Sequence, residues 1–81
     1  MNNKLTAGET ILEAMVYHNL CLGDLVKAIP EVTEDYLLGI LQDRYTITPE
    51  VAVKLARLLD LSSDYILRLQ HYFYKKPLNA F

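Results

Sequence analysis

VTEDYLLGILQDRYTITPE, residues 32–50, contains two helix starts separated by a short loop. Thr33 is a good N-cap, and Glu34 and Asp35 follow in the first turn, where carboxylates suit the positive end of the helix dipole. The stretch Thr48-Pro49-Glu50 is the second start, with a capping hydroxyl, a proline at the first helical position and a carboxylate in the first turn. The segment therefore predicts a short helix, a loop and a further helix.

The same periodicity extends in both directions, and we expect five helices and no strands, because no period-2 alternation is sustained. The first three are expected over about residues 9–18, 22–29 and 34–42, with Thr6 or Gly8 near the start of the first and Pro30 stopping the second. The fourth begins after Thr48. Ser62 or Ser63 caps the fifth, which is expected to end before Pro77. The residues expected to be buried in the first three helices are Ile11, Leu12, Met15, Val16, Leu22, Leu25, Val26, Ile29, Leu37, Leu38 and Ile40 or Leu41. In the last two they are Val51, Ala52, Leu55, Ala56, Leu58, Leu59, Ile66, Leu69 and Phe73.

Length and composition predict one small globular domain over residues 1–81, with an ordered core over about 7–74 and a tail over 75–81. The chain is 52% hydrophobic and 22% charged, which is ordinary for a folded protein. One cysteine, Cys21, excludes an internal disulfide. No apolar run approaches the roughly 20 residues of a membrane span, and the N-terminus lacks the apolar stretch of a secretory signal. We therefore expect a cytoplasmic protein.

The charges of the chain are unevenly distributed, although the net charge is only −2. Residues 1–43 carry two basic and seven acidic side chains, and residues 44–81 carry six basic and three acidic ones. The first part of the quoted segment, residues 32–43, contains no lysine or arginine. Opposite polarity of the two halves is typical of an interaction surface.

The predicted arrangement resembles the lambda-repressor-like (XRE/Cro-type) helix-turn-helix family, and it is closest to the HigA-type antitoxins. The stretch ITPEVAVKLARLLDLSSDYILRLQ, residues 47–70, is similar to their helix-four region nearly position for position. The likeness covers about residues 7–74, is strong over 40–70 and is weak over 20–39. It implies an all-α, compact five-helix bundle with the helix-turn-helix at about residues 22–42.

The resemblance also implies where DNA would be contacted. Glu34, Asp35, Tyr36 and Gly39 fall where family members carry side chains that reach base edges and phosphates, and Gln42-Asp43-Arg44 stands in for Asn-Gly-Lys/Arg. Only Arg44 keeps the type of residue that a phosphate contact needs. The full set of DNA-binding candidates is Thr33, Glu34, Asp35, Tyr36, Gly39, Gln42, Arg44, Thr46 and Thr48.

Two functions from different classes follow. The first is a DNA-binding transcriptional regulator, including the antitoxin and autorepressor of a toxin–antitoxin pair, that binds operator DNA as a homodimer. The second is a helix-turn-helix-fold module without DNA binding that docks a basic partner protein, such as a toxin. We call its expected docking residues Glu31, Glu34, Asp35 and Asp43 the acidic set.

Several of these residues also have plainer interpretations. Glu34 and Asp35 could serve only the helix N-terminus, Gln42 could be a polar helix end, and Arg44 could be a solvated loop residue paired with Asp43. The aromatic end of the chain could bind a partner or a second copy, or it could pack back onto the first helix. Its candidate residues are Tyr65, Leu69, Tyr72, Phe73 and Tyr74.

The sequence carries no pattern typical of an enzyme, a metal site or a cofactor site. His18, His71 and Cys21 are too few and too scattered for zinc. No nucleophile or carboxylate pair has a base at a suggestive spacing, and there is no glycine-rich loop for a phosphate. We expect neither catalysis nor a small-molecule substrate.

Overall fold

The computed structural model describes residues 5–79 of the chain, and the side chains of residues 5–71. Within that range the chain is entirely helical apart from its connections, as predicted. Its helices are α1 (Ala7–Tyr17), α2 (Leu22–Ala28), α3 (Glu34–Leu41), α4 (Pro49–Leu59) and α5 (Ser63–Asn79).

The predicted caps start most of these helices. Thr33 Oγ1 accepts a hydrogen bond from the Tyr36 N–H at 3.1 Å, and Thr48 Oγ1 accepts one from Val51 at 3.3 Å. Ser62 Oγ accepts from the Tyr65 N–H at the start of α5. In α1 the cap is Thr6, one of the two residues expected near its start, and the helix begins at Ala7. Each side chain satisfies an N–H that the helix itself leaves unpaired.

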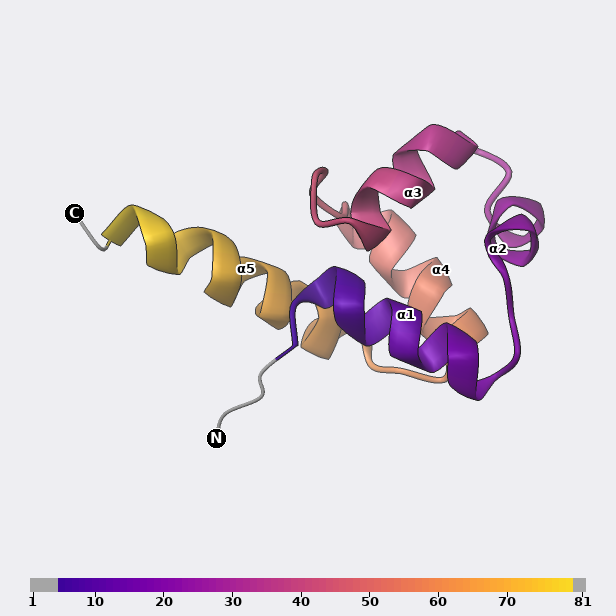
Figure 1. Cartoon of the computed structure of the whole chain (residues 1–81), viewed down its shortest axis with the longest axis horizontal. Helices are drawn as coiled ribbons and strands as arrows, with labels where there is room; N and C mark the ends of the chain where they lie inside the picture. Colours follow the sequence, from indigo (N-terminus) through magenta and orange to yellow (C-terminus); the bar gives the residue numbers. More distant parts are fainter. Residues whose placement is uncertain (1–4, 80–81) are drawn as a thin grey trace.

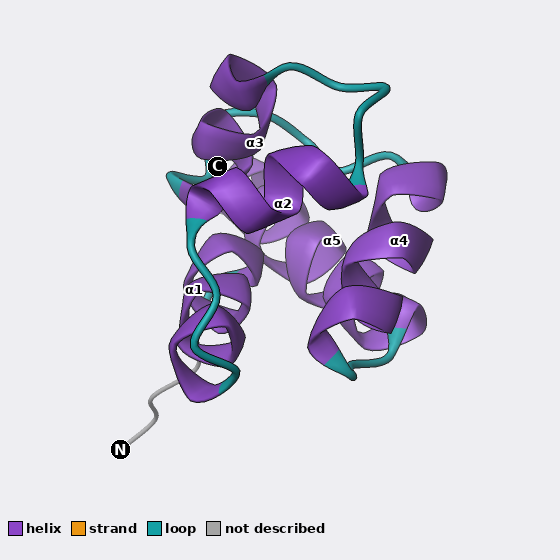
Figure 2. Ribbon diagram, turned by 90° about the vertical axis from the view of Figure 1, so that its right-hand side faces the viewer, coloured by secondary structure: helices purple, strands orange, loops and turns teal. Residues whose placement is uncertain are grey.

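Helix α4 is the central helix, as its wide apolar arc predicted. It contacts α1, α2 and α5, and Val51, Ala52, Leu55, Ala56 and Leu59 are all buried. Figure 2 shows α2 in front, lying against both α3 and α4. The eight largest fully buried side chains come from all five helices and from the residue that follows α2; they are Ile11, Leu25, Ile29, Leu37, Ile40, Leu55, Leu59 and Ile66.

Two predicted core positions of α1 lie on its outer surface. Ile11 and Met15 are buried, but Leu12 is 42% exposed and Val16 is 78% exposed. Successive helical residues are separated by about 100°, so Leu12 and Val16 lie to one side of the face that Ile11 and Met15 bury. Leu38, also expected in the core, is 38% exposed on α3. The buried apolar stripes of α1 and α3 are therefore narrower than predicted.

Helix α5 does not end before Pro77, contrary to the prediction, but continues to Asn79. Proline removes one backbone donor and strains the preceding turn, yet its fixed φ is itself helical, so a proline in the last turn does not by itself end the helix. Helix α5 packs on α4 and α1 near its start, and its far end extends away from the other helices (Figure 1). The described part of the molecule measures 40 × 26 × 19 Å as a result.

Candidate nucleic-acid interface

The outer face of α3 carries two free carboxylates. Glu34 and Asp35 are exposed in its first turn, and neither forms an ion pair within the described part of the chain. Leu38 lies one turn further along from Glu34 and is 38% exposed. Gln42, the C-cap residue, is also exposed and continues this face. A molecule bound to this face would meet two carboxylate acceptors, one apolar side chain and one side-chain amide.

Two other candidates on α3 are engaged inside the protein. The Tyr36 ring stacks on Tyr45 with centroids 5.8 Å apart and planes 13° apart, and its hydroxyl donates to the Thr46 carbonyl at 2.6 Å. Gly39 lies directly beneath the Tyr45 ring, which occupies the space that a Cβ would need. The part of α3 that holds Tyr36 and Gly39 is therefore covered by the loop that follows the helix.

Arg44 lies in that loop, immediately after the end of α3. Its guanidinium carbon is 5.5 Å from the centroid of the Tyr45 ring, and the residue is exposed. Its backbone N–H donates to the Gly39 carbonyl at 2.7 Å, which closes the end of the helix. Arg44 is thus a solvent-facing cation on a fixed piece of backbone.

Asp43, a member of the acidic set expected to dock a partner, instead binds within the protein. Its Oδ2 accepts from the Thr6 hydroxyl at 2.6 Å, and its Oδ1 accepts from the Gly8 N–H at 3.0 Å. The carboxylate therefore binds the N-terminus of α1, where both the free N–H groups and the helix dipole favour a negative charge. Asp43 has φ of 59°, the left-handed conformation that commonly ends helices and that aspartate tolerates.

Glu31 is also occupied, because it forms an ion pair with Lys54 of α4. Two of the four carboxylates in the acidic set are therefore engaged within the protein, Glu31 by a lysine and Asp43 by a helix N-terminus. Glu34 and Asp35 remain available to a partner. All four were expected on one docking face, and only this adjacent pair lacks an internal partner among the described residues.

The loop before α4 is held by a residue that the sequence analysis missed. Gln70 of α5 accepts from the Ile47 N–H at 2.5 Å through Oε1, and its Nε2 donates to the Ile47 carbonyl at 3.1 Å. Its sequence signal is a polar residue four positions after the buried Ile66, on the face of α5 that meets the core. Of the two threonines proposed in this loop, Thr46 accepts from Tyr36 through its carbonyl, and Thr48 caps α4.

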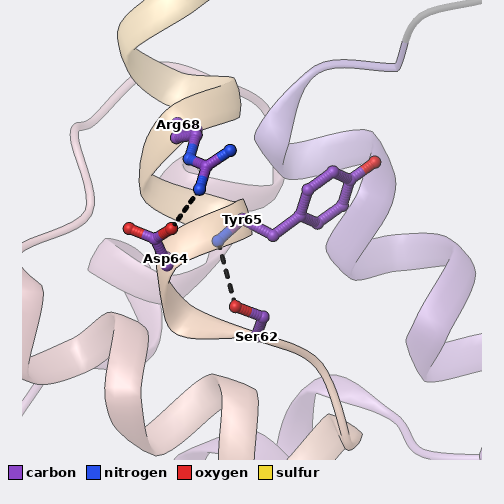
Figure 3. A network of polar contacts seen from close by, with 4 residues as sticks. All are labelled: Ser62, Asp64, Tyr65 and Arg68. Atoms are coloured by element: carbon purple, nitrogen blue, oxygen red, sulfur yellow. Dashed lines mark hydrogen bonds and ion pairs between the residues drawn. The ribbon is translucent and has the colours of Figure 1, made fainter.

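Two of the residues expected to contact a partner, Tyr65 and Leu69, lie in the part of α5 whose side chains the structure describes. Tyr65 is 50% exposed and its ring extends toward α1, next to the Asp64–Arg68 ion pair of 2.6 Å (Figure 3). Leu69 is half-buried and packs against the core. Tyr72, Phe73 and Tyr74, the other expected members, have side chains outside the described residues.

The histidine and the cysteine near the α1–α2 connection are both engaged in helix ends. His18 Nε2 donates to the Leu59 carbonyl at 2.9 Å, at the C-terminus of α4. Asp24 accepts from the backbone N–H of Cys21 at 2.8 Å and from its thiol at 3.3 Å. These two hydrogen bonds, with a smaller contribution from Lys27, lower the pKa of the Asp24 carboxyl. Among the described residues, no three histidine, cysteine or carboxylate side chains are placed to hold a metal ion.

Comparisons with known proteins give no match. No family model matches the chain, and neither the curated proteins nor the solved structures contain a significant relative. In the described part of the chain, no helix is long and apolar enough to cross a membrane. The chemistry of the exposed side chains therefore carries the functional assignment.

Proposed function

We propose that this protein is a helix-turn-helix regulator that binds double-stranded DNA through α3 and the loop that follows it. Support comes from two helices in contact, α2 and α3, joined by the short connection 29–33. The outer face of α3 is exposed, which a helix entering the major groove requires. The observation that carries the proposal is Arg44, an exposed arginine fixed against Tyr45 at the end of α3.

Each exposed side chain has a role that its chemistry allows. Arg44 contacts a phosphate, which provides affinity without sequence preference. Glu34 and Asp35 accept hydrogen bonds from cytosine amino groups, and Leu38 contacts a thymine methyl. Because phosphates repel these two carboxylates, we expect modest affinity at low salt and strong dependence on sequence.

A dimer completes the proposal. One α3 covers only part of an operator, and two-fold symmetry places two such helices about one helical turn of DNA apart. The far end of α5 extends beyond the other helices (Figure 1), which supports its use as the contact with a second copy. We include in this proposal the role of an antitoxin that represses its own operon. In that role α5 both forms the dimer and binds the toxin.

Fluorescence anisotropy tests DNA binding. The probe is a labelled duplex from upstream of the protein's own gene, titrated at about 50 and about 200 mM salt, with a random duplex as control. We expect selective binding that weakens as salt rises, and a loss of affinity with Arg44→Ala. Lys54→Ala is unsuitable as a control because Lys54 pairs with Glu31, so Arg57→Ala, an exposed cation of the last turn of α4, serves instead. Equal losses for Arg44→Ala and Arg57→Ala would contradict the role of Arg44.

A second function is favoured by one observation, the exposed Leu38 close to Glu34 and Asp35 on α3. An apolar centre beside two carboxylates suits a basic partner protein such as a toxin. Binding of that kind depends less steeply on salt than binding through several phosphates does. A partner that copurifies with the wild type, and is lost with Leu38→Ser while DNA binding is absent, would establish this function instead.

A further inference from the structure

The Arg44 side chain is part of a stack of three residues that brings together α3 and the α3–α4 loop. The Arg44 guanidinium lies over the Tyr45 ring, and the Tyr45 ring stacks on Tyr36. Stacked arginine is common where a guanidinium must be presented in one orientation, because its planar fork pairs with two acceptor oxygens at once.

Two further contacts fix the position of Tyr45. The Tyr36 hydroxyl donates to the Thr46 carbonyl, which ties the ring of one tyrosine to the backbone next to the other. Gly39 supplies the space, because a Cβ there would overlap Cδ2 and Cε2 of the Tyr45 ring. An alanine at this position must therefore displace Tyr45, although residue 39 itself is buried.

We infer that Tyr45 is the positioning residue for Arg44, and that Gly39 permits this role by leaving room for the ring. The inference rests on the proposed function, in which Arg44 binds a phosphate group of DNA. A free arginine side chain loses rotamer freedom when it binds, whereas a guanidinium already held on an aromatic face loses less. Tyr45 thereby contributes to DNA affinity without touching DNA itself.

The test is a double-mutant cycle on the duplex used above. Tyr45→Ala is expected to weaken binding about two- to fivefold, the equivalent of a cation–π contact at an exposed site. Tyr45→Phe keeps the ring and is expected to bind like the wild type. Gly39→Ala is expected to lose as much affinity as Tyr45→Ala. In the Arg44→Ala background, Tyr45→Ala should change affinity no further, because the guanidinium that it positions is gone.

A second measurement reads the stack without DNA. Ring currents from Tyr45 shift the proton resonances of the Arg44 side chain, and Gly39→Ala and Tyr45→Ala should both abolish that shift while Tyr45→Phe retains it. Circular dichroism and urea unfolding confirm that each variant is folded. Equal effects of Tyr45→Ala with and without Arg44 would overturn the inference while leaving DNA binding in place. Failure of the wild type to bind any duplex at about 50 mM salt would overturn the proposed function, and the positioning role with it.

Discussion

Replacing Asp43 with glycine tests whether this carboxylate holds the N-terminus of α1. Glycine adopts the left-handed conformation without strain, so the backbone at φ of 59° is preserved. The change therefore removes the side chain alone, and with it the hydrogen bonds from Thr6 and Gly8. Asp60→Gly is the matched control, because Asp60 has φ of 58° at the end of α4 and no side-chain hydrogen bond within the described residues.

The expected difference follows from the two lost bonds. A hydrogen bond to a charged acceptor contributes about 1.5–3 kcal/mol, and a half-buried site with access to water belongs at the lower end of that range. Replacing a left-handed aspartate with glycine also changes the free energy of the backbone, and this contribution is the same at both positions. Subtracting the effect of Asp60→Gly removes it. Asp43→Gly should therefore lower the free energy of unfolding by about 2–4 kcal/mol more than Asp60→Gly does.

Urea unfolding followed by circular dichroism measures this difference. For a protein of this size the free energy changes by about 1 kcal/mol per molar urea, so the Asp43→Gly midpoint should fall at least about 2 M below that of Asp60→Gly. Midpoints within about 0.5 M of each other would refute the capping role.

Three further predictions concern single contacts. Gly8→Ala should destabilise the protein by about 1–3 kcal/mol, because a Cβ there would lie 2.6 Å from two backbone carbonyl oxygens of α3. At Gly23 an added Cβ would make only an ordinary contact at 3.7 Å, so Gly23→Ala should stabilise α2 by about 0.5–1 kcal/mol. Urea unfolding measures both changes. Gln70→Ala should expose the Ile47 amide to rapid hydrogen exchange, whereas retained protection at that amide would contradict its pairing. Because the folded pKa of Asp24 is lowered, its stabilising contribution is present above the ordinary carboxyl pKa and is lost as pH falls through the lowered value. As pH falls from neutral through and below the ordinary carboxyl pKa, the wild type should therefore lose more stability than Asp24→Asn does, and equal losses would contradict the lowered pKa.

Local rules predicted much of the fold. Thr33, Thr48 and Ser62 act as caps where the sequence placed them, because a cap depends only on residues within one helical turn. The central position of α4 also followed from its own apolar arc. The exposed Leu12 and Val16 were missed, because the width of a buried stripe depends on how closely the neighbouring helices approach.

The candidate site was less predictable, because its contacts join residues distant in sequence. Asp43 binds Thr6 across 37 positions, and Gln70 binds Ile47 across 23. No local pattern distinguishes an aspartate that caps another helix from one on a docking surface. The stack of Tyr45 on Tyr36 similarly depends on the path of a loop. It also gives Gly39, which the resemblance placed among the DNA-binding candidates, a role within the protein, because the Tyr45 ring occupies the space that a Cβ would need.

Removing the charge of the two α3 carboxylates decides whether this helix faces DNA. Glu34→Gln and Asp35→Asn keep the shape of both exposed side chains, and the double variant is titrated with the upstream duplex and a random duplex. We expect tighter binding to the random duplex, because repulsion from the phosphates is relieved, together with a loss of preference for the upstream sequence. Unchanged affinity for both duplexes, at a salt concentration where the wild type binds, would show that α3 does not face the DNA.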